Sequence, residues 1–313
     1  MADYGHDLHF GLFATPSAHD HAAVVDLAVR ADRAGLDLVT YQDHPYHPAL
    51  LDTWTLMSYV AASTERIRIA PNVVNLPLRS PAVLARAAAS LDVLSGGRFE
   101  LALGAGSFWD AIVAMGGPRR TPGQALAALR EAIGIIRQVW DTSARGGVKA
   151  EGEFYRVMGA KRGPEPAHPI GIWLGALGPR MLALTGELAD GWVPSFEYLP
   201  DGLDSLSAMN ERIDTAAEAA GRPPGAVRRY LNVMNASLGG PGGGRFLHGP
   251  VEQWIDELTD AALTHGVGGF LIGGDDARLV DVLAAEIAPA VRAQVADHRG
   301  TTRSPPGGSA GTG

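Results

Sequence analysis

The sequence predicts a (β/α)8 barrel, also called a TIM barrel, built from parallel strands. Short runs of branched apolar residues alternate along the chain with segments whose apolar residues recur every three or four positions, the spacing of a helix with one buried face. The chain has 313 residues, of which 46% are hydrophobic and 19% charged, enough to bury one large core. Repeated strand–helix units in a chain of this length indicate a closed barrel, and a doubly wound open sheet is the alternative.

The expected strands are nearly continuous in apolar character, as strands covered by helices should be. In chain order they are Leu8–Ala14, Leu38–Tyr41, Ile67–Val74, Phe99–Leu103, Ile170–Leu174, Gly191–Val193, Tyr230–Asn235 and Gly269–Ile272. Between them, Leu84, Ala87, Leu91 and Leu94 show the helical spacing. Ser80-Pro81 and Gly178-Pro179 each place a proline where a first helical turn is expected.

We expect residues 1–296 to form one domain and residues 297–313, rich in glycine, proline and serine, to form a disordered tail. Residues 141–169 are an insertion between the fourth helix and the fifth strand, and Glu153–Met158 at its centre predicts a small hairpin. The nucleotide-binding fingerprint of the open-sheet alternative is incomplete. Gly104-Ala105-Gly106 follows a strand, but Trp109 stands where the third glycine would be.

Composition excludes several classes of function. A net charge of −8 disfavours a nucleic-acid-binding protein, which needs a basic surface. The absence of cysteine excludes disulfides, thiolate metal sites and a cysteine nucleophile. No apolar run approaches about 18 residues, so we expect no membrane span. The N-terminal residues do not follow the pattern of a secretory signal, and the expected location is cytoplasmic.

The residues that follow the strands are the candidates for function, because barrel enzymes place their sites at the carboxyl ends of the strands. Asp43-His44 is an adjacent carboxylate–imidazole pair after the second strand, suited to acid–base chemistry near neutral pH. The alternative is a capping aspartate beside a solvated histidine. His47 follows, but Pro45 and Pro48 disfavour a helix that would pair it with His44, so we expect no metal site.

An anion site is predicted where Gly178-Pro179 opens a helix, because the first backbone N–H groups of a helix bind anions and Arg180 adds positive charge. An ordinary turn is the alternative. Several aromatic residues also follow the strands, which predicts a pocket for a flat organic molecule. They are Phe13, Tyr41, Tyr46, Phe108, Trp109, Phe196 and Tyr198.

Taken together, these segments resemble the bacterial luciferase-like flavin- or deazaflavin-dependent oxidoreductases. The resemblance runs from Leu8 to about Val291. It is carried by LHFGLFA, YQDHP, RIAPNVVNLPLRSPAVLARAAASLDVLSGGRFELALGAG, EGEFYRV, IWLGALGPRMLALTGELADGWVPS and GPVEQW. None of these segments would be specific alone.

The resemblance implies a cofactor ring at the carboxyl ends of the strands, with a non-proline cis peptide at Asn72-Val73 pressed against it. It implies His44 as the catalytic residue facing the ring and the substrate, next to Asp43. The remaining positions that it implies for cofactor binding are Gly106, Ala176, Leu177, Gly178, Pro179 and Ser195.

One departure from the family concerns the substrate. Where sugar-phosphate dehydrogenases of the family carry a glutamate that donates a proton, this chain has Trp109. We therefore expect Trp109, with Phe13, Tyr46 and Phe196, to line a pocket for an apolar or aromatic small molecule rather than for a sugar phosphate.

Coenzyme F420 is favoured over FMN, because the chain is compact and has Asp-His-Pro where related FMN monooxygenases often have Glu-His-His. The expected function is an F420-dependent oxidoreductase that transfers a hydride between the deazaflavin and an organic substrate. The alternatives are an FMN-dependent monooxygenase that receives reduced flavin from a separate reductase, and a non-catalytic flavin-binding protein. Family members are commonly dimers, so a homodimer is expected.

Overall fold

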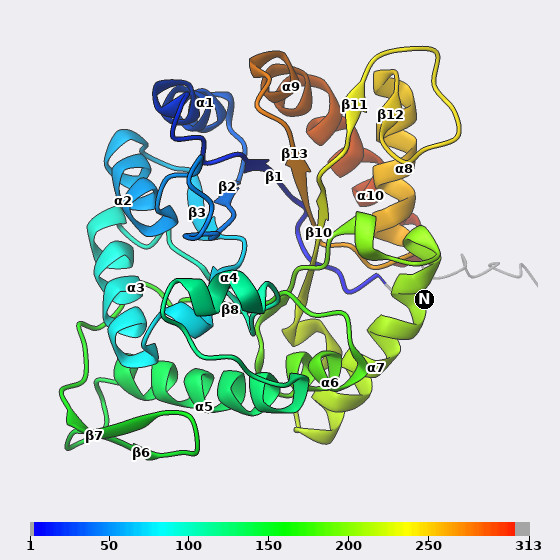
Figure 1. Cartoon of the computed structure of the whole chain (residues 1–313). Helices are drawn as coiled ribbons and strands as arrows, with labels where there is room; N and C mark the ends of the chain where they lie inside the picture. Colours follow the sequence, from blue (N-terminus) through cyan, green and yellow to red (C-terminus); the bar gives the residue numbers. More distant parts are fainter. Residues whose placement is uncertain (1–2, 304–313) are drawn as a thin grey trace, which may run out of the picture.

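The computed structural model describes residues 3–303, in which a ring of parallel strands is surrounded by helices (Figure 1). The strands are ordered β3-β2-β1-β13-β10-β9-β8-β5-β4. Their bounds are β1 His9–Ala14, β2 Leu38–Tyr41, β3 Arg68–Pro71, β4 Val74–Asn75, β5 Leu101–Gly104, β8 Ile172–Leu174, β9 Gly191–Trp192, β10 Arg228–Val233 and β13 Gly269–Gly273. The predicted barrel is confirmed.

The ring is nearly closed by a strand that is interrupted near its carboxyl end. β3 pairs with β2, and β4 pairs with β5. An isolated parallel bridge between Ile69 and Phe99 adds a contact on the β3 side of the gap. The single strand expected over Ile67–Val74 is therefore two short strands, separated at Asn72 and Val73. This interruption lies at the carboxyl end of the strand, where barrel sites form.

The helices are amphipathic or largely apolar and cover the outside of the ring. They are α1 His21–Ala34, α2 Thr53–Ser63, α3 Pro81–Ser95, α4 Trp109–Ala114, α5 Pro122–Trp140, α6 Pro179–Leu188, α7 Ser205–Ala219, α8 Val251–Leu263, α9 Ala277–Val282 and α10 Ala288–Arg303. α3 and α6 begin at prolines, as predicted. α5 begins with a capping box in which Thr121 and Gln124 each accept a backbone hydrogen bond from the other.

Two short strand pairs lie outside the ring. β6 (Val148–Glu151) and β7 (Arg156–Ala160) form an antiparallel hairpin that confirms the one expected in the insertion. Its turn is held by Glu131 of α5, whose carboxylate accepts three backbone N–H groups of residues 153–155. β11 (Ser237–Leu238) pairs with β12 (His248–Gly249) at the base of the glycine-rich loop.

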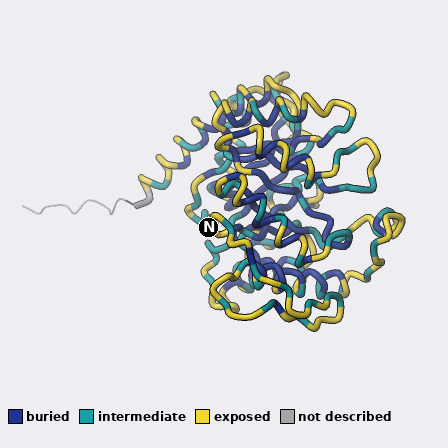
Figure 2. The backbone as a smooth tube through the Cα atoms, turned by 90° about the vertical axis from the view of Figure 1, so that its left-hand side faces the viewer, coloured by how far each residue is buried: buried dark blue, intermediate teal, exposed yellow. Residues whose placement is uncertain are grey.

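Strand alternation divides the buried residues into an inner and an outer layer. Buried backbone runs through the middle of the molecule, and exposed backbone lies mostly at its edges (Figure 2). The outer layer, between strands and helices, is the larger one. The inner layer fills the barrel with Leu38, Ala70, Ala102, Trp173, Val193, Tyr230 and Leu271, and Phe13 and Val73 pack against it. Val39 and Tyr41 belong to the outer layer, so Thr40 between them faces inward.

The amino-terminal mouth of the barrel is closed by charged residues. His168 Nδ1 lies 2.7 Å from Oδ1 of the fully buried Asp92, and Glu100 binds Arg68 at 2.8 Å and accepts the Gly171 N–H at 2.7 Å. The pKa of His168 is raised to about 9 by hydrogen bonds with the carboxylate of Asp92, which has the larger effect, and with that of Glu100. This cluster ties the beginnings of β3, β5 and β8 together, far from the carboxyl mouth.

The C-terminal helix α10 continues to Arg303, into the segment expected to be disordered. Arg299 explains the extra turns, because its guanidinium binds both oxygens of Asp3 and donates to the His6 carbonyl. Residues 304–313 of the expected tail lie outside the described residues. Within residues 3–303, no helix combines the length and the apolar character that a membrane span requires, and a cytoplasmic location stays a prediction.

Candidate active site at the carboxyl ends of the strands

Asp43, directly after β2, anchors one side of the site. Its side chain is only 1% exposed. Oδ2 accepts the Asn75 backbone N–H at 3.0 Å and Arg79 Nε at 3.0 Å, and Oδ1 accepts Arg79 Nη2 at 2.9 Å. Both carboxylate oxygens are thus engaged by groups of the protein itself, and the alternative that Asp43 caps a helix is not what the structure shows.

His44, the next residue, lies in an aromatic cluster with Tyr46 and Phe108. Its ring stacks on Tyr46 with centroids 5.4 Å apart and an angle of 19°, and it meets Phe108 edge-on at 5.4 Å and 71°. Burial lowers the pKa of His44, while Asp43 acts in the opposite direction. The imidazole is therefore neutral at pH 7, and no group within residues 3–303 hydrogen-bonds to its ring nitrogens. A neutral, unpaired imidazole can accept a proton.

A polar network crosses the barrel mouth beside this cluster. Asn72 Nδ2 donates to Thr40 Oγ1 at 3.2 Å and to Asn232 Oδ1 at 2.7 Å. Asn232 Nδ2 donates back to Asn72 Oδ1 at 3.2 Å and to Ser195 Oγ at 3.4 Å. The network joins β2, β3, β10 and the segment after β9, and it fixes the Asn72 side chain. The Asn72-Val73 peptide bond is cis, as the resemblance implies.

Val73 forms an apolar floor in the mouth. A Cβ at Gly104, at the end of β5, would lie 2.6 Å from Val73 Cγ2, and one at Gly175, after β8, would lie 3.3 Å from Val73 Cγ1. Because these two glycines have no Cβ atom, there is room between them for the Val73 side chain. Phe13 packs against the same inner layer.

Asn75, at the end of β4, carries an unsatisfied acceptor beside His44. Alternation places Val73 and Asn75 on the inner side of the strand and Val74 in the outer layer. The Asn75 side chain is 8% exposed, and its Oδ1 has no hydrogen-bond partner within the described residues. Burial raises the pKa of Tyr46, and a hydrogen bond from the Asn75 side chain partly opposes that shift. Buried polar atoms normally find a partner, and Asn75 Oδ1 is one of the few in the described residues that does not.

Gly106 and Trp109 form the wall after β5. Gly106 has a φ of 102°, and a Cβ there would lie 2.8 Å from both Pro77 Cγ and the Trp109 ring. This position therefore requires glycine twice over, for its backbone conformation and for its contacts. Trp109 packs over Gly106 at the start of α4, and its neighbour Phe108 reaches the His44 ring.

The turn after β8 presents an uncapped helix N-terminus. Ala176 is buried, and its carbonyl accepts Trp192 Nε1 at 2.8 Å. Leu177, Gly178 and Pro179 are exposed, and Gly178 precedes α6 without a side-chain cap and with open space around it. Arg180 is exposed and has no acidic partner within residues 3–303. The first N–H groups of α6 and this guanidinium fit an anion such as a phosphate.

The contacts above join several of the predicted residues, and three of the predicted aromatic residues lie outside the His44 cluster: Phe196, Tyr41 and Tyr198, the last of which is 63% exposed. Phe196 stacks on Phe246 of the glycine-rich loop, with centroids 4.7 Å apart, rather than on the His44 cluster. Tyr41 lies in the outer layer and not in the mouth. The sequence reasoning did not identify Thr40, Asn75, Arg79 or Asn232. Asn232 had a signal, because it is a polar residue between the apolar Leu231 and Val233 of β10, and Arg79 had none.

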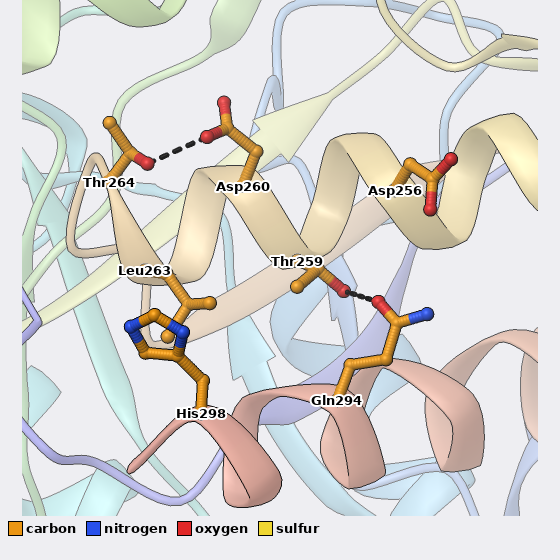
Figure 3. Close-up of a pocket in the computed structure, with 7 residues that line it drawn as sticks. All are labelled: Asp256, Thr259, Asp260, Leu263, Thr264, Gln294 and His298. Carbon is orange, nitrogen blue, oxygen red and sulfur yellow. Dashed lines mark hydrogen bonds between the residues drawn. The ribbon is translucent and has the colours of Figure 1, made fainter. Parts of the chain in front are cut away.

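Two recessed regions lie away from these residues. A groove of about 650 Å³ runs between α8 and α10, lined by residues such as Asp256, Thr259 and Gln294 (Figure 3). Thr259 Oγ1 donates to Gln294 Oε1 there at 2.8 Å. A smaller hollow of about 320 Å³ lies at the amino-terminal mouth, beside His9 and Arg68. No group of three or more acidic or histidine side chains within residues 3–303 is arranged to hold a metal ion.

Comparison with known proteins matches this chain to a family. Residues 8–237 match the family model described as luciferase-like monooxygenase. The chain is 30% identical over 239 residues to the F420-dependent glucose-6-phosphate dehydrogenase of Kineococcus radiotolerans, covering 74% of this chain and 68% of that protein. It is 29% identical to the 5,10-methylenetetrahydromethanopterin reductase of Archaeoglobus fulgidus, covering 84% of this chain and 93% of the other.

The fold is also similar to that of solved structures. An F420-dependent secondary alcohol dehydrogenase, in complex with an F420-acetone adduct, superposes with a TM-score of 0.79 at 18% identity, over 91% of this chain and 99% of that one. The F420-dependent tetrahydromethanopterin reductase of Methanopyrus kandleri superposes with a TM-score of 0.77 at 19% identity, over 90% and 99%. At these identities the likeness shows the fold.

Proposed function

This chain belongs to the luciferase-like monooxygenase family of enzymes, and we propose that it is an F420-dependent oxidoreductase acting on an uncharged, apolar or aromatic substrate. One observation carries the proposal. An unpaired, neutral His44 lies in an aromatic cluster after β2, and Val73 packs against the apolar inner layer of the barrel. The relatives named above, whose names include F420-dependent dehydrogenases and a reductase, support the cofactor.

The residues present fit the proposed cofactor. The uncapped start of α6 and the exposed Arg180 would hold its phosphate, and Ser195, inside the polar network, would lie near its tail. Val73 and the fixed Asn72 would support its planar ring. When bound, F420 supplies or accepts the hydride. The protein contributes binding, orientation and the exclusion of water.

His44 is the proposed acid–base residue. Because burial keeps the imidazole neutral near pH 7, it can take the hydroxyl proton of an alcohol substrate as the hydride leaves carbon. In the reverse direction the protonated ring returns that proton to a carbonyl oxygen. Tyr46 and Phe108 contact the ring from its face and from its edge.

The proposed substrate class differs from the sugar phosphate named for the Kineococcus relative. Trp109, Phe108 and Tyr46 make the mouth aromatic. The two lysines of the chain, Lys149 in β6 and Lys161 just after β7, both belong to the outer hairpin, so no lysine is available to bind a sugar phosphate at the mouth.

The test is a titration of the protein with F420 and, separately, with FMN. Binding is measured by the quenching of the fluorescence of the six tryptophans. We expect tighter binding of F420, and then reduction of F420 by small alcohols but not by glucose 6-phosphate. Binding of FMN alone, with oxygen consumption when the flavin is reduced by a separate reductase, would replace the proposal with the monooxygenase alternative. Binding of F420 without turnover across a wide substrate panel would favour the non-catalytic alternative.

We further propose that the enzyme is a homodimer that pairs through the outer faces of α2 and α3. Tyr59 of α2 is 64% exposed, and Val83 and Leu94 of α3, three helical turns apart on one face, are 69% and 84% exposed. α2 carries no charged side chain. Such an apolar surface is unusual on a helix facing water. Light scattering should give twice the chain mass, and Leu94→Glu should halve it.

A further inference from the structure

We propose that Arg79 is a positioning residue for His44, holding Asp43 as a buried ionised carboxylate that fixes both the location and the protonation of the imidazole. The inference rests on the proposed function for the role of His44. Arg79 does not belong to the aromatic cluster and follows the short 3-10 helix of residues 76–78, after β4. It acts through Asp43.

The Arg79 guanidinium has partners on several sides. Its Nε and Nη2 bind the two oxygens of Asp43 at 3.0 and 2.9 Å, a bidentate arrangement that lysine cannot reproduce. Nη2 also binds Asp52 Oδ2 at 3.0 Å, and the guanidinium carbon lies 5.9 Å from the Trp54 ring centroid. Asp52 is itself fixed as the N-cap of α2, accepting the Thr55 N–H at 2.9 Å. The guanidinium therefore has a defined orientation.

Asp43, once its side chain is fixed by Arg79, constrains two parts of the site. It is adjacent in sequence to His44, so fixing its side chain fixes the backbone that carries the imidazole. It also accepts the backbone N–H of Asn75, at the end of β4. One carboxylate thus joins the loop after β2 to the end of β4, and Arg79 supplies the charge that allows this carboxylate to be buried.

The same ion pair sets the electrostatic surroundings of His44. The groups that act on its imidazole are Asp43, which favours the protonated form, and His47, which disfavours it. Tyr46 and Phe108 pack against the ring without charge. Arg79 binds both oxygens of Asp43 and so partly balances the negative charge of this carboxylate. Without Arg79, that charge would act on the imidazole alone and stabilise the protonated form, which is unable to accept a proton.

The experiment follows the titration of His44 by NMR in histidine-labelled protein without added cofactor. In Arg79→Met we expect the midpoint of His44 to rise by about one pH unit, a tenfold change in the ratio of protonated to neutral imidazole at a given pH. The matched control is Arg130→Met, which removes the bidentate surface partner of Glu187 and should leave the midpoint where it is. An unchanged or lowered midpoint in folded Arg79→Met overturns the proposal.

Asp43→Asn provides a second test that leaves no buried carboxylate unpaired. We expect the midpoint of His44 to fall in Asp43→Asn, because the charge of Arg79 is then unopposed, and to return toward the wild-type value in Arg79→Met/Asp43→Asn. Equal midpoints in wild type and Asp43→Asn would overturn the proposal even if Arg79→Met does not fold. Failure of the proposed function would appear elsewhere, as unaltered turnover in His44→Ala while these midpoints still move.

Discussion

Replacing Gly104 with alanine tests the floor of the site. A Cβ at this position would lie 2.6 Å from Val73 Cγ2 and 3.4 Å from the Val74 carbonyl oxygen. Val73 has little room to yield, because its side chain is β-branched and packs against the inner layer of the barrel. The extra methyl group must therefore displace Val73 or the end of β5.

Overpacking of this kind costs about 1–3 kcal/mol of unfolding free energy. Urea unfolding of Gly104→Ala should show a lower midpoint with an unchanged slope. We also expect F420 to bind at least about tenfold more weakly, a loss of about 1.4 kcal/mol, because the displaced valine would reshape the floor under the ring. Gly175→Ala, with its longer 3.3 Å approach, should show smaller losses in both measurements.

The matched control is Gly134→Ala in α5, where an added Cβ meets nothing within 4 Å. Removing a glycine from a helix interior should stabilise the protein by about 0.5–1 kcal/mol without affecting F420 binding. Wild-type stability and wild-type F420 affinity in Gly104→Ala would refute the packing of Val73 against β5 and, with it, the assignment of Val73 as the floor.

Three further predictions concern charged and titratable groups. His44→Ala should lower turnover by about 10²–10⁴-fold with F420 affinity unchanged, whereas His47→Ala should retain activity; full turnover in His44→Ala would remove the assigned role. Arg180→Gln should weaken F420 binding by about tenfold at low salt and less at high salt, as isothermal titration can measure, and equal affinities would exclude Arg180 from the phosphate site. At the opposite mouth, the pKa of His168, raised to about 9, predicts a contribution of up to about 3 kcal/mol that is complete below about pH 6.5 and lost as the pH rises through 9. Urea unfolding should therefore show His168→Gln losing less stability between pH 6 and pH 10 than wild type, and parallel losses would contradict this account.

Much of the fold could be predicted from the sequence, because the signals are local. Apolar runs and helical spacing located the strands and helices of the ring, and the prolines at positions 81 and 179 marked where α3 and α6 begin. The interruption between β3 and β4 was invisible in the pattern, since Ile67–Val74 is apolar apart from Arg68 and Asn72. Only the resemblance pointed to Asn72-Val73.

The candidate site was predicted in outline, and its supporting residues were not. Asp43 and His44 were identified as neighbours in sequence, but the partner that holds Asp43 is Arg79, 36 residues away along the chain. No local pattern predicts such a pair, because it depends on how two strand ends meet. The inward position of Thr40 and the outward position of Tyr41 follow from strand alternation, which the sequence reasoning had not applied to the aromatic residues.

The structure of the protein crystallised with F420 tests the central claim most directly. The account predicts the phosphate at the N-terminus of α6 near Arg180, the deazaflavin ring against Val73, and the His44 imidazole within hydrogen-bonding reach of a molecule bound over that ring. A ring bound away from Val73, or a phosphate held elsewhere with His44 remote from the bound cofactor, would contradict it.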